Sequence, residues 1–349
     1  MVRPEGRRRT AAKAHSRRFG PLGRQAALGS ATTLAGVRAL VTGGAGFIGS
    51  NLAHRLITDG HDVRVLDDLS TGYEENVPSE ADLIEANVAD ETEVKKAMQD
   101  IDVVFHQAAH RAVLRSVEHP LETDTANTHG TLTVLQAARE AGVRRFVSAS
   151  SSSVYGGAEQ LPTPESAPLL PRSPYAVTKL TGEHYARVFA ELYGLETVAL
   201  RYFNVYGPRQ RPDSAYAAVI PLFIDALRKG EPPTVHGDGE QSRDFTFITD
   251  VVAANLAAAT APATACSGKA YNIAGGGRYS LLTLLDILGR HLGVRPEPVF
   301  TEARAGDVRH SQADIAAAQR DLGYRPSVDF DTGLARTVEW FARKGPVTG

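Results

Sequence analysis

At 349 residues, the chain is long enough to form two domains with a large hydrophobic core. Its hydrophobic content of 42% is ordinary for a globular protein, and its net charge of −2 gives no global indication of nucleic-acid or membrane binding. The single cysteine, Cys266, excludes an internal disulfide framework, and no Cys/His metal spacing occurs. We therefore expect a cytoplasmic protein without a metal site.

The first 35 residues differ in composition from the rest of the chain. They contain eight basic residues and one acidic residue, Glu5, and no apolar run of the kind found in signal peptides follows the arginines. We predict that residues 1–35 form a disordered extension; an early start codon or a nucleic-acid-binding tail are alternatives. No stretch of the chain approaches the roughly 20 apolar residues of a membrane-spanning helix.

The first regular elements combine a strand, a glycine loop, a helix and a second strand. Residues 37–42 read as a buried strand, residues 50–57 as a helix closed by Gly60, and residues 63–66 as a strand that ends at Asp67. The loop carries glycines at 43, 46 and 49. In this context, the glycines predict a dinucleotide-binding turn, although their spacing departs from the common Gly-x-Gly-x-x-Gly.

This turn suggests how a cofactor would be held. The glycines allow a pyrophosphate to approach the backbone, and the N-terminus of the helix that follows offers free N–H groups to it. Asp67 is placed to accept the adenosine ribose hydroxyls and would repel a 2′-phosphate. We therefore predict NAD rather than NADP, bound by Gly43, Gly46, Phe47, Ile48, Gly49 and Asp67.

Strands and helices continue to alternate along the chain. Helices are expected at 91–100 and 121–141, and strands at 103–106, 145–149 and 195–201. This pattern predicts an α/β fold with a Rossmann-type, doubly wound parallel sheet whose carboxyl edge binds ligands. Ala108 and Ala109 follow a strand at that edge and leave room for the cofactor. Beyond residue 201 we expect a smaller substrate domain, which gives boundaries of 1–35, 36–201 and 202–349, with helices near 216–229, 249–260, 280–292 and 329–343.

Tyr175 and Lys179 carry the strongest catalytic signal. Ser173-Pro174 is typical of a helix start, and a spacing of four residues places the two side chains on one helical face. The Lys179 ammonium is expected to lower the pKa of the Tyr175 phenol, which would make the tyrosine a competent proton shuttle. A run of serines at 150–153 follows a central strand and could share a hydrogen bond with Tyr175 and a substrate oxygen.

Together, the glycine loop, Asp67, the serine run and Tyr175/Lys179 resemble the extended short-chain dehydrogenase/reductase family that acts on nucleotide sugars. The resemblance runs from about residue 37 to residue 341. The stretches 201–204, 215–221, 237–245 and 306–314 are most similar to bacterial UDP-N-acetylglucosamine 4-epimerases. The resemblance implies a homodimer that binds NAD tightly and epimerises a UDP-sugar through a transient 4-keto intermediate, with the helix from Leu121 and the helix of Tyr175 forming the dimer contact.

The resemblance also implies roles for individual residues. Ser151 would be the catalytic hydroxyl, Tyr175 the acid/base, and Lys179 the holder of the nicotinamide ribose. The implied substrate-binding residues are Asn127, Ser152, Ser153, Asn204, Arg211, Arg243, Arg304 and Ser311. Of these, Arg243 and Arg304 would clamp the diphosphate, and Ser311 would leave space beside the sugar's 2-substituent.

Some positions depart from the family pattern and keep alternatives open. Ser153 stands where related dehydratases and decarboxylases have a glutamate, and Asn87 where many relatives have an adenine-binding aspartate. Residues 208–213 resemble UDP-glucuronate 4-epimerases, whose arginine can meet a carboxylate. A UDP-glucuronate 4-epimerase or decarboxylase is therefore one alternative, and a catalytically silent NAD-binding sensor on the same fold is another.

Overall fold

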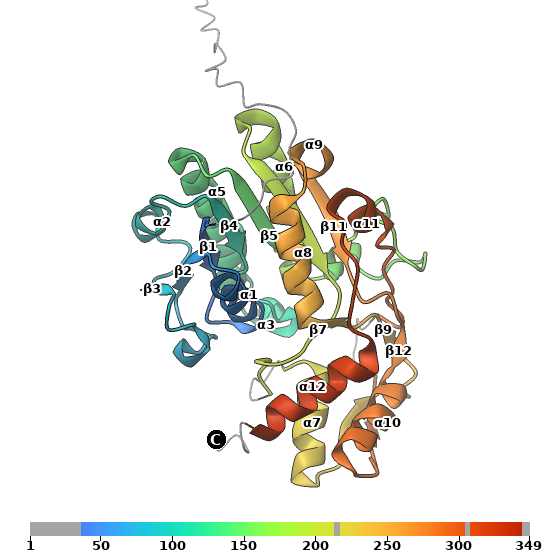
Figure 1. Cartoon of the computed structure of the whole chain (residues 1–349). Coiled ribbons are helices and arrows are strands. Elements are labelled where there is room, and N and C mark those ends of the chain that lie inside the picture. The colour runs from blue at the N-terminus through green and yellow to red at the C-terminus, as the bar shows by residue number, and fades with distance from the viewer. Residues whose placement is uncertain (1–35, 213–216, 304–307, 344–349) are drawn as a thin grey trace, which may run out of the picture. The chain divides into compact units, whose positions relative to one another are not determined.

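A seven-stranded parallel sheet lies at the centre of the structure, a computed structural model that describes residues 36–212, 217–303 and 308–343 (Figure 1). From one edge to the other, the strands are β11 (Lys269–Ile273), β6 (Glu196–Tyr202), β5 (Arg145–Ser151), β4 (Val103–His106), β1 (Arg38–Thr42), β2 (Asp62–Asp67) and β3 (Asp82–Glu85). The chain leaves β1 towards β2 and later returns to β4 on the other side of β1. This reversal is the point at which doubly wound sheets bind ligands, and it confirms the predicted fold class.

Helices cover both faces of the sheet because its strands alternate apolar side chains between two cores. Leu40 packs with one core, whereas its neighbours Ala39 and Val41 pack with the other. One face carries α2 (Glu91–Ala97), α5 (Gly130–Ala141) and α6 (Pro174–Tyr193). The opposite face carries α1 (Phe47–Thr58) and α8 (Ile248–Thr260), and α8 lies in front of the sheet in Figure 1.

The ends of these helices follow the expected capping chemistry. The Ser173 hydroxyl accepts a hydrogen bond from the backbone N–H of Ala176 (3.2 Å), and Pro174 occupies the first turn of α6. Gly60, after α1, has a φ of 84°, and Gly142, after α5, has a φ of 73°. Both angles lie in the left-handed region, which glycine adopts without steric cost.

The predicted helix over 121–141 has an irregular centre. It consists of α4 (Pro120–Asp124), a π-helical turn η2 (Thr125–His129) and α5, and the short α3 (Val113–Glu118) precedes it. Single π turns inside helices are frequent at functional sites, where they redirect a side chain.

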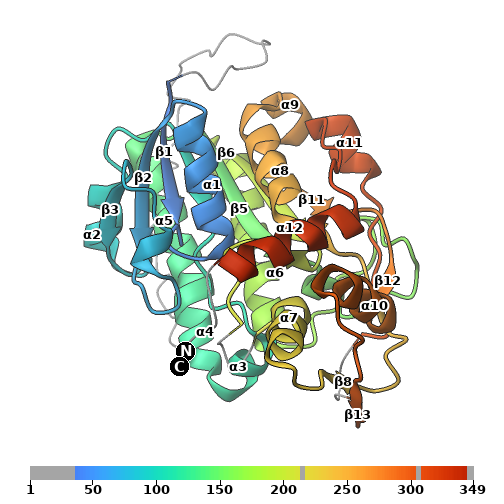
Figure 2. The same ribbon diagram turned by 60° about the horizontal axis from the view of Figure 1, so that its bottom comes forward.

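The second half of the chain forms a smaller layer of helices and two-stranded sheets beside the large one (Figure 2). Its helices are α7 (Val219–Lys229), α10 (Leu281–Leu292) and α12 (Phe330–Arg343), close to the predicted stretches. Its strands pair as β7 (Val205–Tyr206) with β10 (Thr246–Phe247), β9 (Ser242–Arg243) with β12 (Tyr279–Ser280), and β8 (Thr234–His236) with β13 (Val299–Thr301). Short helical elements complete the list: η1 (Glu74–Asn76), η3 (Ser152–Tyr155), α9 (Ala263–Cys266) and α11 (Ala316–Leu322).

The large sheet extends beyond residue 201, where we placed the end of the NAD-binding domain. Strand β11 pairs with β6, and α8 packs against the sheet, although both come from the segment assigned to the substrate domain. The predicted extension at 1–35 lies outside the described residues. Within the described ranges, no helix is both long enough and apolar enough to cross a membrane.

Candidate active site

A cavity of about 730 Å³ opens at the carboxyl ends of the central strands, and we call it the sheet-end cavity. It is bounded by the loops after β1, β2, β4 and β5, by the start of α6, and by the segment after β6. Its lining includes all the predicted cofactor-binding residues: Gly43, Gly46, Phe47, Ile48, Gly49, Asp67, Ala108, Ala109 and Lys179. The topology therefore gathers at one edge the groups that the sequence separates.

The glycine loop has the geometry of a dinucleotide cradle. A Cβ atom on Gly49 would lie 2.1 Å from the Gly43 carbonyl oxygen, and one on Gly43 would lie 2.6 Å from the Ala108 nitrogen. These two glycines are thus required by close backbone packing. A Cβ atom on Gly46 would meet only the Gly43 oxygen, at 3.2 Å. Close packing therefore does not require this glycine, and its missing side chain instead lets a ligand approach the backbone.

Helix α1 offers free donors at the same place. Its N-cap is Gly46, which has no side chain to accept a hydrogen bond, and its first turn has no acidic residue. Among the described residues, the backbone N–H groups of Phe47 and Ile48 have no hydrogen-bond acceptor. Unsatisfied N–H groups at a helix N-terminus suit an anion, and the residues present therefore fit the pyrophosphate of NAD.

Asp67 closes the adenosine end of this cradle. Its carboxylate accepts hydrogen bonds from the backbone N–H groups of Ala45 (2.9 Å) and Leu69 (2.9 Å), which fix its orientation. Burial raises the pKa of Asp67, and those two hydrogen bonds oppose the shift. Each carboxylate oxygen retains acceptor capacity, so Asp67 can still accept ribose hydroxyls. Asn87, beside it, donates to the Asp68 carboxylate at 2.7 Å and also lines the cavity.

The serine run and α6 meet across the cavity. Ser151, Ser152 and Ser153 line it at the end of β5, together with Tyr175 and Lys179 from α6. The Ser151 hydroxyl accepts hydrogen bonds from the backbone N–H (3.1 Å) and the hydroxyl (2.9 Å) of Ser153, and it lies beside the Tyr175 phenol, whose pKa it lowers. The Lys179 ammonium donates to the carbonyl oxygen of Ala149 at 2.9 Å, which leaves two N–H donors for a ligand.

The ionisation of Tyr175 differs from our prediction. Burial raises the pKa of the phenol, whereas the hydrogen bond with Ser151 and the positive charge of Arg111 lower it. The predicted net lowering of the Tyr175 pKa was therefore wrong. Lys179 is itself buried, which lowers its own pKa to about 8 against the opposing effect of Glu183. The buried ammonium is directed at the Ala149 carbonyl.

Two residues that line the sheet-end cavity, Arg111 and Gln210, were missed by the sequence analysis. Arg111 is exposed in the cavity mouth, and it follows His110 in the loop after β4. Gln210 is buried and lines the cavity, and its Oε1 atom has no partner among the described residues. A signal for Arg111 was present, because it comes two residues after the expected Ala108-Ala109 edge.

The predicted substrate residues divide into two groups. Asn204 and Arg211 line the cavity with Ser152 and Ser153. The Arg211 guanidinium donates to the carbonyl oxygen of Thr71 (2.8 Å) and lies over the Tyr73 ring. Asn204 has a φ of 34°, a strained angle that asparagine tolerates better than most residues, and its amide donates to the Ser311 hydroxyl at 3.3 Å.

The other predicted substrate residues do not line the cavity. Asn127, in the π turn, is buried, and its amide binds the backbone of His110 and the hydroxyl of Thr178. Asn127 therefore holds the cavity wall from behind rather than facing a substrate. Arg243 donates to the carbonyl oxygen of Ser242 at 3.0 Å, and Ser311 lies behind Asn204. Arg304 lies outside the described residues.

Comparisons with known proteins place this architecture in a family. The model of the NAD dependent epimerase/dehydratase family matches residues 39–274. The UDP-glucose 4-epimerase of Mycolicibacterium smegmatis is 40% identical over 319 residues, which cover 88% of this chain and 99% of that protein. The chain belongs to the NAD-dependent epimerase/dehydratase family.

Solved structures agree with this assignment. A UDP-glucose 4-epimerase from Thermotoga maritima, solved with UDP-glucose, is 37% identical with a TM-score of 0.85, covering 88% of this chain and 99% of that one. A UDP-N-acetylglucosamine 4-epimerase from Methanobrevibacter ruminantium M1, in complex with UDP-N-acetylmuramic acid, is 38% identical with a TM-score of 0.84, covering 89% and 100%. The protein is an NAD-dependent nucleotide-sugar epimerase, as predicted.

Proposed function

We propose that the protein interconverts the C4 epimers of a UDP-sugar, with UDP-N-acetylglucosamine and UDP-N-acetylgalactosamine as its preferred pair. The observation that carries this proposal is the convergence of Ser151, Tyr175 and Lys179 beside the glycine cradle in one cavity. NAD bound in that cradle supplies reversible oxidation at C4 of the sugar.

The chain's own residues have separate tasks in this proposal. Tyr175 removes the proton from the sugar O4 and returns it after the sugar has turned over, a contribution of about 10²–10⁴ in rate. Ser151 lines the same cavity beside Tyr175 and would share a hydrogen bond with the sugar O4 and with the phenol. Lys179 holds the nicotinamide ribose with the two donors that Ala149 leaves free. Gly43, Gly46, Gly49 and Asp67 bind the cofactor.

The preference for an N-acetyl sugar rests on Ser311. Its hydroxyl accepts from Asn204, and Asn204 lines the sugar end of the cavity. A small residue at 311 lets the Asn204 side chain lie against it, away from the cavity, and this leaves room for an acetamido group. A tyrosine at this position would push Asn204 into the cavity and remove that room.

The test compares substrates in two proteins. We expect the wild type to interconvert UDP-N-acetylglucosamine and UDP-N-acetylgalactosamine, and Ser311→Tyr to lose this activity while keeping turnover of UDP-glucose. The measurement is kcat/KM for both substrates, with products identified by NMR. An unchanged ratio of the two values would remove Ser311 as the selector.

A second candidate substrate is UDP-glucuronate. Arg111 and Arg211 line the sugar end of the cavity, and an arginine fork suits the C6 carboxylate of a uronic acid. Ser153, in place of a glutamate, disfavours decarboxylation. Activity on UDP-glucuronate without activity on UDP-N-acetylglucosamine would replace the first candidate with this one.

We also propose a homodimer. Apolar side chains are exposed on α3, α4 and α6, including Val117 (61% exposed), Leu121 (82%) and Val177 (49%). An apolar patch spread over neighbouring helices is typical of an interface between subunits. Light scattering of the wild type and of Leu121→Glu tests this. A monomeric wild type would refute the proposal.

A further inference from the structure

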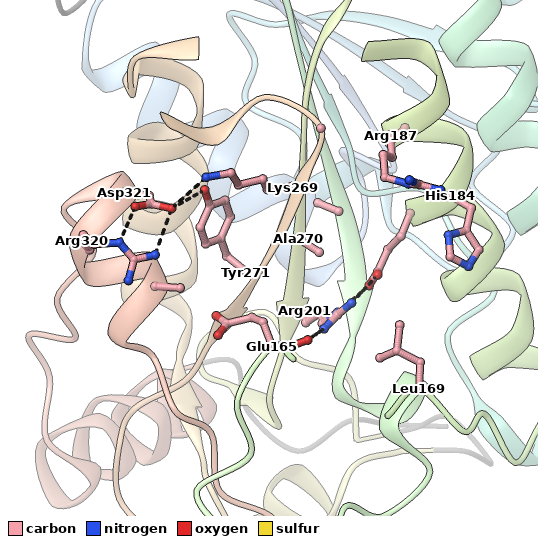
Figure 3. Close-up of a pocket in the computed structure, with 15 residues that line it drawn as sticks. Glu165, Leu169, His184, Arg187, Arg201, Lys269, Ala270, Tyr271, Arg320 and Asp321 are labelled. Carbon is pink, nitrogen blue, oxygen red and sulfur yellow. Dashed lines mark hydrogen bonds and ion pairs between the residues drawn. The ribbon is translucent and has the colours of Figure 1, made fainter. Parts of the chain in front are cut away.

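A second cavity, of about 390 Å³, lies between α6 and the edge of the sheet, and we call it the edge cavity (Figure 3). Its floor includes Arg201 on β6 and Ala270 on β11, and one wall is formed by residues of α6 such as His184 and Arg187. Most of its charged groups are paired with one another. Asp321 accepts from the Tyr271 hydroxyl (3.0 Å), from Arg320 (2.8 Å) and from Lys269 (3.4 Å).

One ion pair of the edge cavity contacts a residue that lines the sheet-end cavity. Glu183 and Arg201 line the edge cavity, and both are buried. The Glu183 carboxylate accepts from Arg201 Nε (2.9 Å) and Nη2 (2.7 Å), and from the hydroxyl of Ser150 (2.5 Å). Ser150 lines the sheet-end cavity, so Glu183 contacts a group of the reaction site from behind.

The pair is held rigidly on its far side. Arg201 Nη1 donates to the Tyr155 hydroxyl (2.8 Å) and to the carbonyl oxygen of Glu165 (3.2 Å). The Tyr155 hydroxyl in turn donates to the Asn272 side chain at 2.7 Å. These contacts fix Arg201. The Glu183 carboxylate is therefore fixed as well, because Arg201 binds it through two hydrogen bonds.

Glu183 lies on the same face of helix α6 as Tyr175 and Lys179. Tyr175, Lys179 and Glu183 follow one another at intervals of four residues, and all three are buried on the face that packs against the sheet. Lys179 thus has Tyr175 one turn before it and Glu183 one turn after it. Removing a lysine ammonium from water favours its neutral form, and a nearby negative charge opposes this effect.

We propose that Glu183 is a positioning residue for Lys179, whose buried ammonium it stabilises from one helical turn away, while Arg201 fixes Glu183 in place. The inference rests on the proposed function of Lys179 as the holder of the nicotinamide ribose. It adds the carboxylate and its clamp to the groups on which that function depends.

The other groups around Lys179 do not supply this negative charge. His106 on β4 is buried and neutral, because burial and the Lys179 charge lower its pKa to about 3. Tyr175 is uncharged at neutral pH, because burial raises its pKa. On β5, the Ala149 carbonyl contributes only a dipole. Arg201 and Arg111 are cations. Glu183 is the carboxylate that raises the pKa of Lys179, which burial holds at about 8.

Four proteins separate this role from a structural one: the wild type, Glu183→Asp, Arg201→Met, and the double variant Glu183→Gln/Arg201→Met. The double variant removes both charges and leaves no unpaired buried cation. Arg201→Met alone disrupts the same packing but keeps the carboxylate. The primary measurement is the affinity of NAD-stripped protein for NAD between pH 6 and 9.5 by calorimetry, and the second is the pH profile of kcat.

We expect NAD affinity of the wild type to fall above pH 8, as Lys179 loses its proton. In the double variant this fall should begin about one pH unit lower, since an opposite charge within one helical turn typically shifts a pKa by that order. Glu183→Asp should keep the wild-type limb. Arg201→Met, which releases the carboxylate but keeps its negative charge, should shift the limb by less than the double variant does, and it will be less stable. The proposal would be overturned if NAD affinity fell at the same pH in the double variant and the wild type. It would also be overturned if Arg201→Met shifted this fall as far as the double variant does. If the wild type turned over no nucleotide sugar, the proposed function would fail, whereas the NAD titration would still decide this inference.

Discussion

The two cavities beside α6 differ in how their polar groups are satisfied. In the edge cavity, Asp321 accepts from three neighbours, and Glu183 and Arg201 bind each other in two places. In the sheet-end cavity, Lys179 retains two donors, and the N–H groups of Phe47 and Ile48 have no acceptor among the described residues.

Orphaned side-chain atoms show the same contrast. Buried side-chain nitrogen and oxygen atoms without a partner include His110 Nδ1, Arg115 Nε and Gln210 Oε1, and these three residues line the sheet-end cavity. Among the described residues, none of the orphaned atoms belongs to the lining of the edge cavity. An unpaired buried group costs free energy, so these three atoms are candidates for hydrogen bonds with a ligand in the sheet-end cavity. Unmet hydrogen bonds, rather than charge, therefore distinguish the two cavities.

The largest expected effect compares two buried tyrosines: Tyr175, which lines the sheet-end cavity, and Tyr155, which contacts Arg201 of the edge cavity. Tyr175→Phe should retain NAD and lose about 10²–10⁴ in kcat, because the acid/base hydroxyl is removed. Tyr155→Phe loses the hydrogen bonds with Arg201 and Asn272 and should instead cost about 1–3 kcal/mol of stability with little change in kcat. The measurements are kcat, bound NAD by absorbance, and urea unfolding. Substantial residual turnover in Tyr175→Phe would remove its assigned function.

The next effect concerns the cradle. Gly46→Ala adds a methyl group 3.2 Å from the Gly43 oxygen, at an ordinary φ of −79°, and should weaken NAD binding by about tenfold or more because it raises the cavity floor. Gly60→Ala is the matched control. Its φ of 84° predicts a loss of roughly 1 kcal/mol in stability with unchanged NAD affinity. Calorimetry measures NAD affinity and thermal unfolding measures stability in both variants. Equal NAD affinities in the two variants would contradict the proposed function of Gly46 in cofactor binding.

A smaller effect tests the charge that acts on Tyr175. Burial raises the pKa of the phenol, and Arg111 partly offsets this. Arg111→Met should therefore raise that pKa further and move the acidic limb of kcat to higher pH, with a severalfold loss of kcat at neutral pH. Arg115→Met, in the same cavity, should leave the limb in place. A loss of kcat in Arg111→Met without a shift of the limb would point to substrate binding instead.

The smallest effect is expected at the edge cavity. Asp321→Asn weakens contacts with Lys269 and Arg320, whose side chains are 53% and 67% exposed. Pairs this exposed contribute about 0–1 kcal/mol, so we expect a slight loss in melting temperature and unchanged kcat. A large loss of turnover would mean that the edge cavity belongs to the reaction site after all.

The parts of the molecule that the sequence predicted well depend on local rules. Short apolar runs located the strands, and capping residues located the ends of α1, α5 and α6. The glycine loop, Asp67 and the pair Tyr175/Lys179 are recognisable because their chemistry requires fixed spacing along a single strand or helix.

The features that the sequence did not reveal all involve contacts between distant segments. The position of β11 in the main sheet depends on pairing with β6, and no local pattern records that pairing. The orientation of Asn127 away from the cavity depends on Thr178 and His110, which are remote in sequence. The sign of the pKa shift at Tyr175 was wrong because burial, which outweighs any single charge here, follows from the folded environment.

The position of β11 has a consequence for how the protein is made. During synthesis β6 leaves the ribosome well before β11, and until β11 arrives the backbone of β6 is an open strand edge, of the kind that pairs with other chains. Nascent chains of this protein should therefore need protection through that interval. We also expect a chain cut before Lys269 to aggregate rather than to yield an isolated cofactor-binding domain.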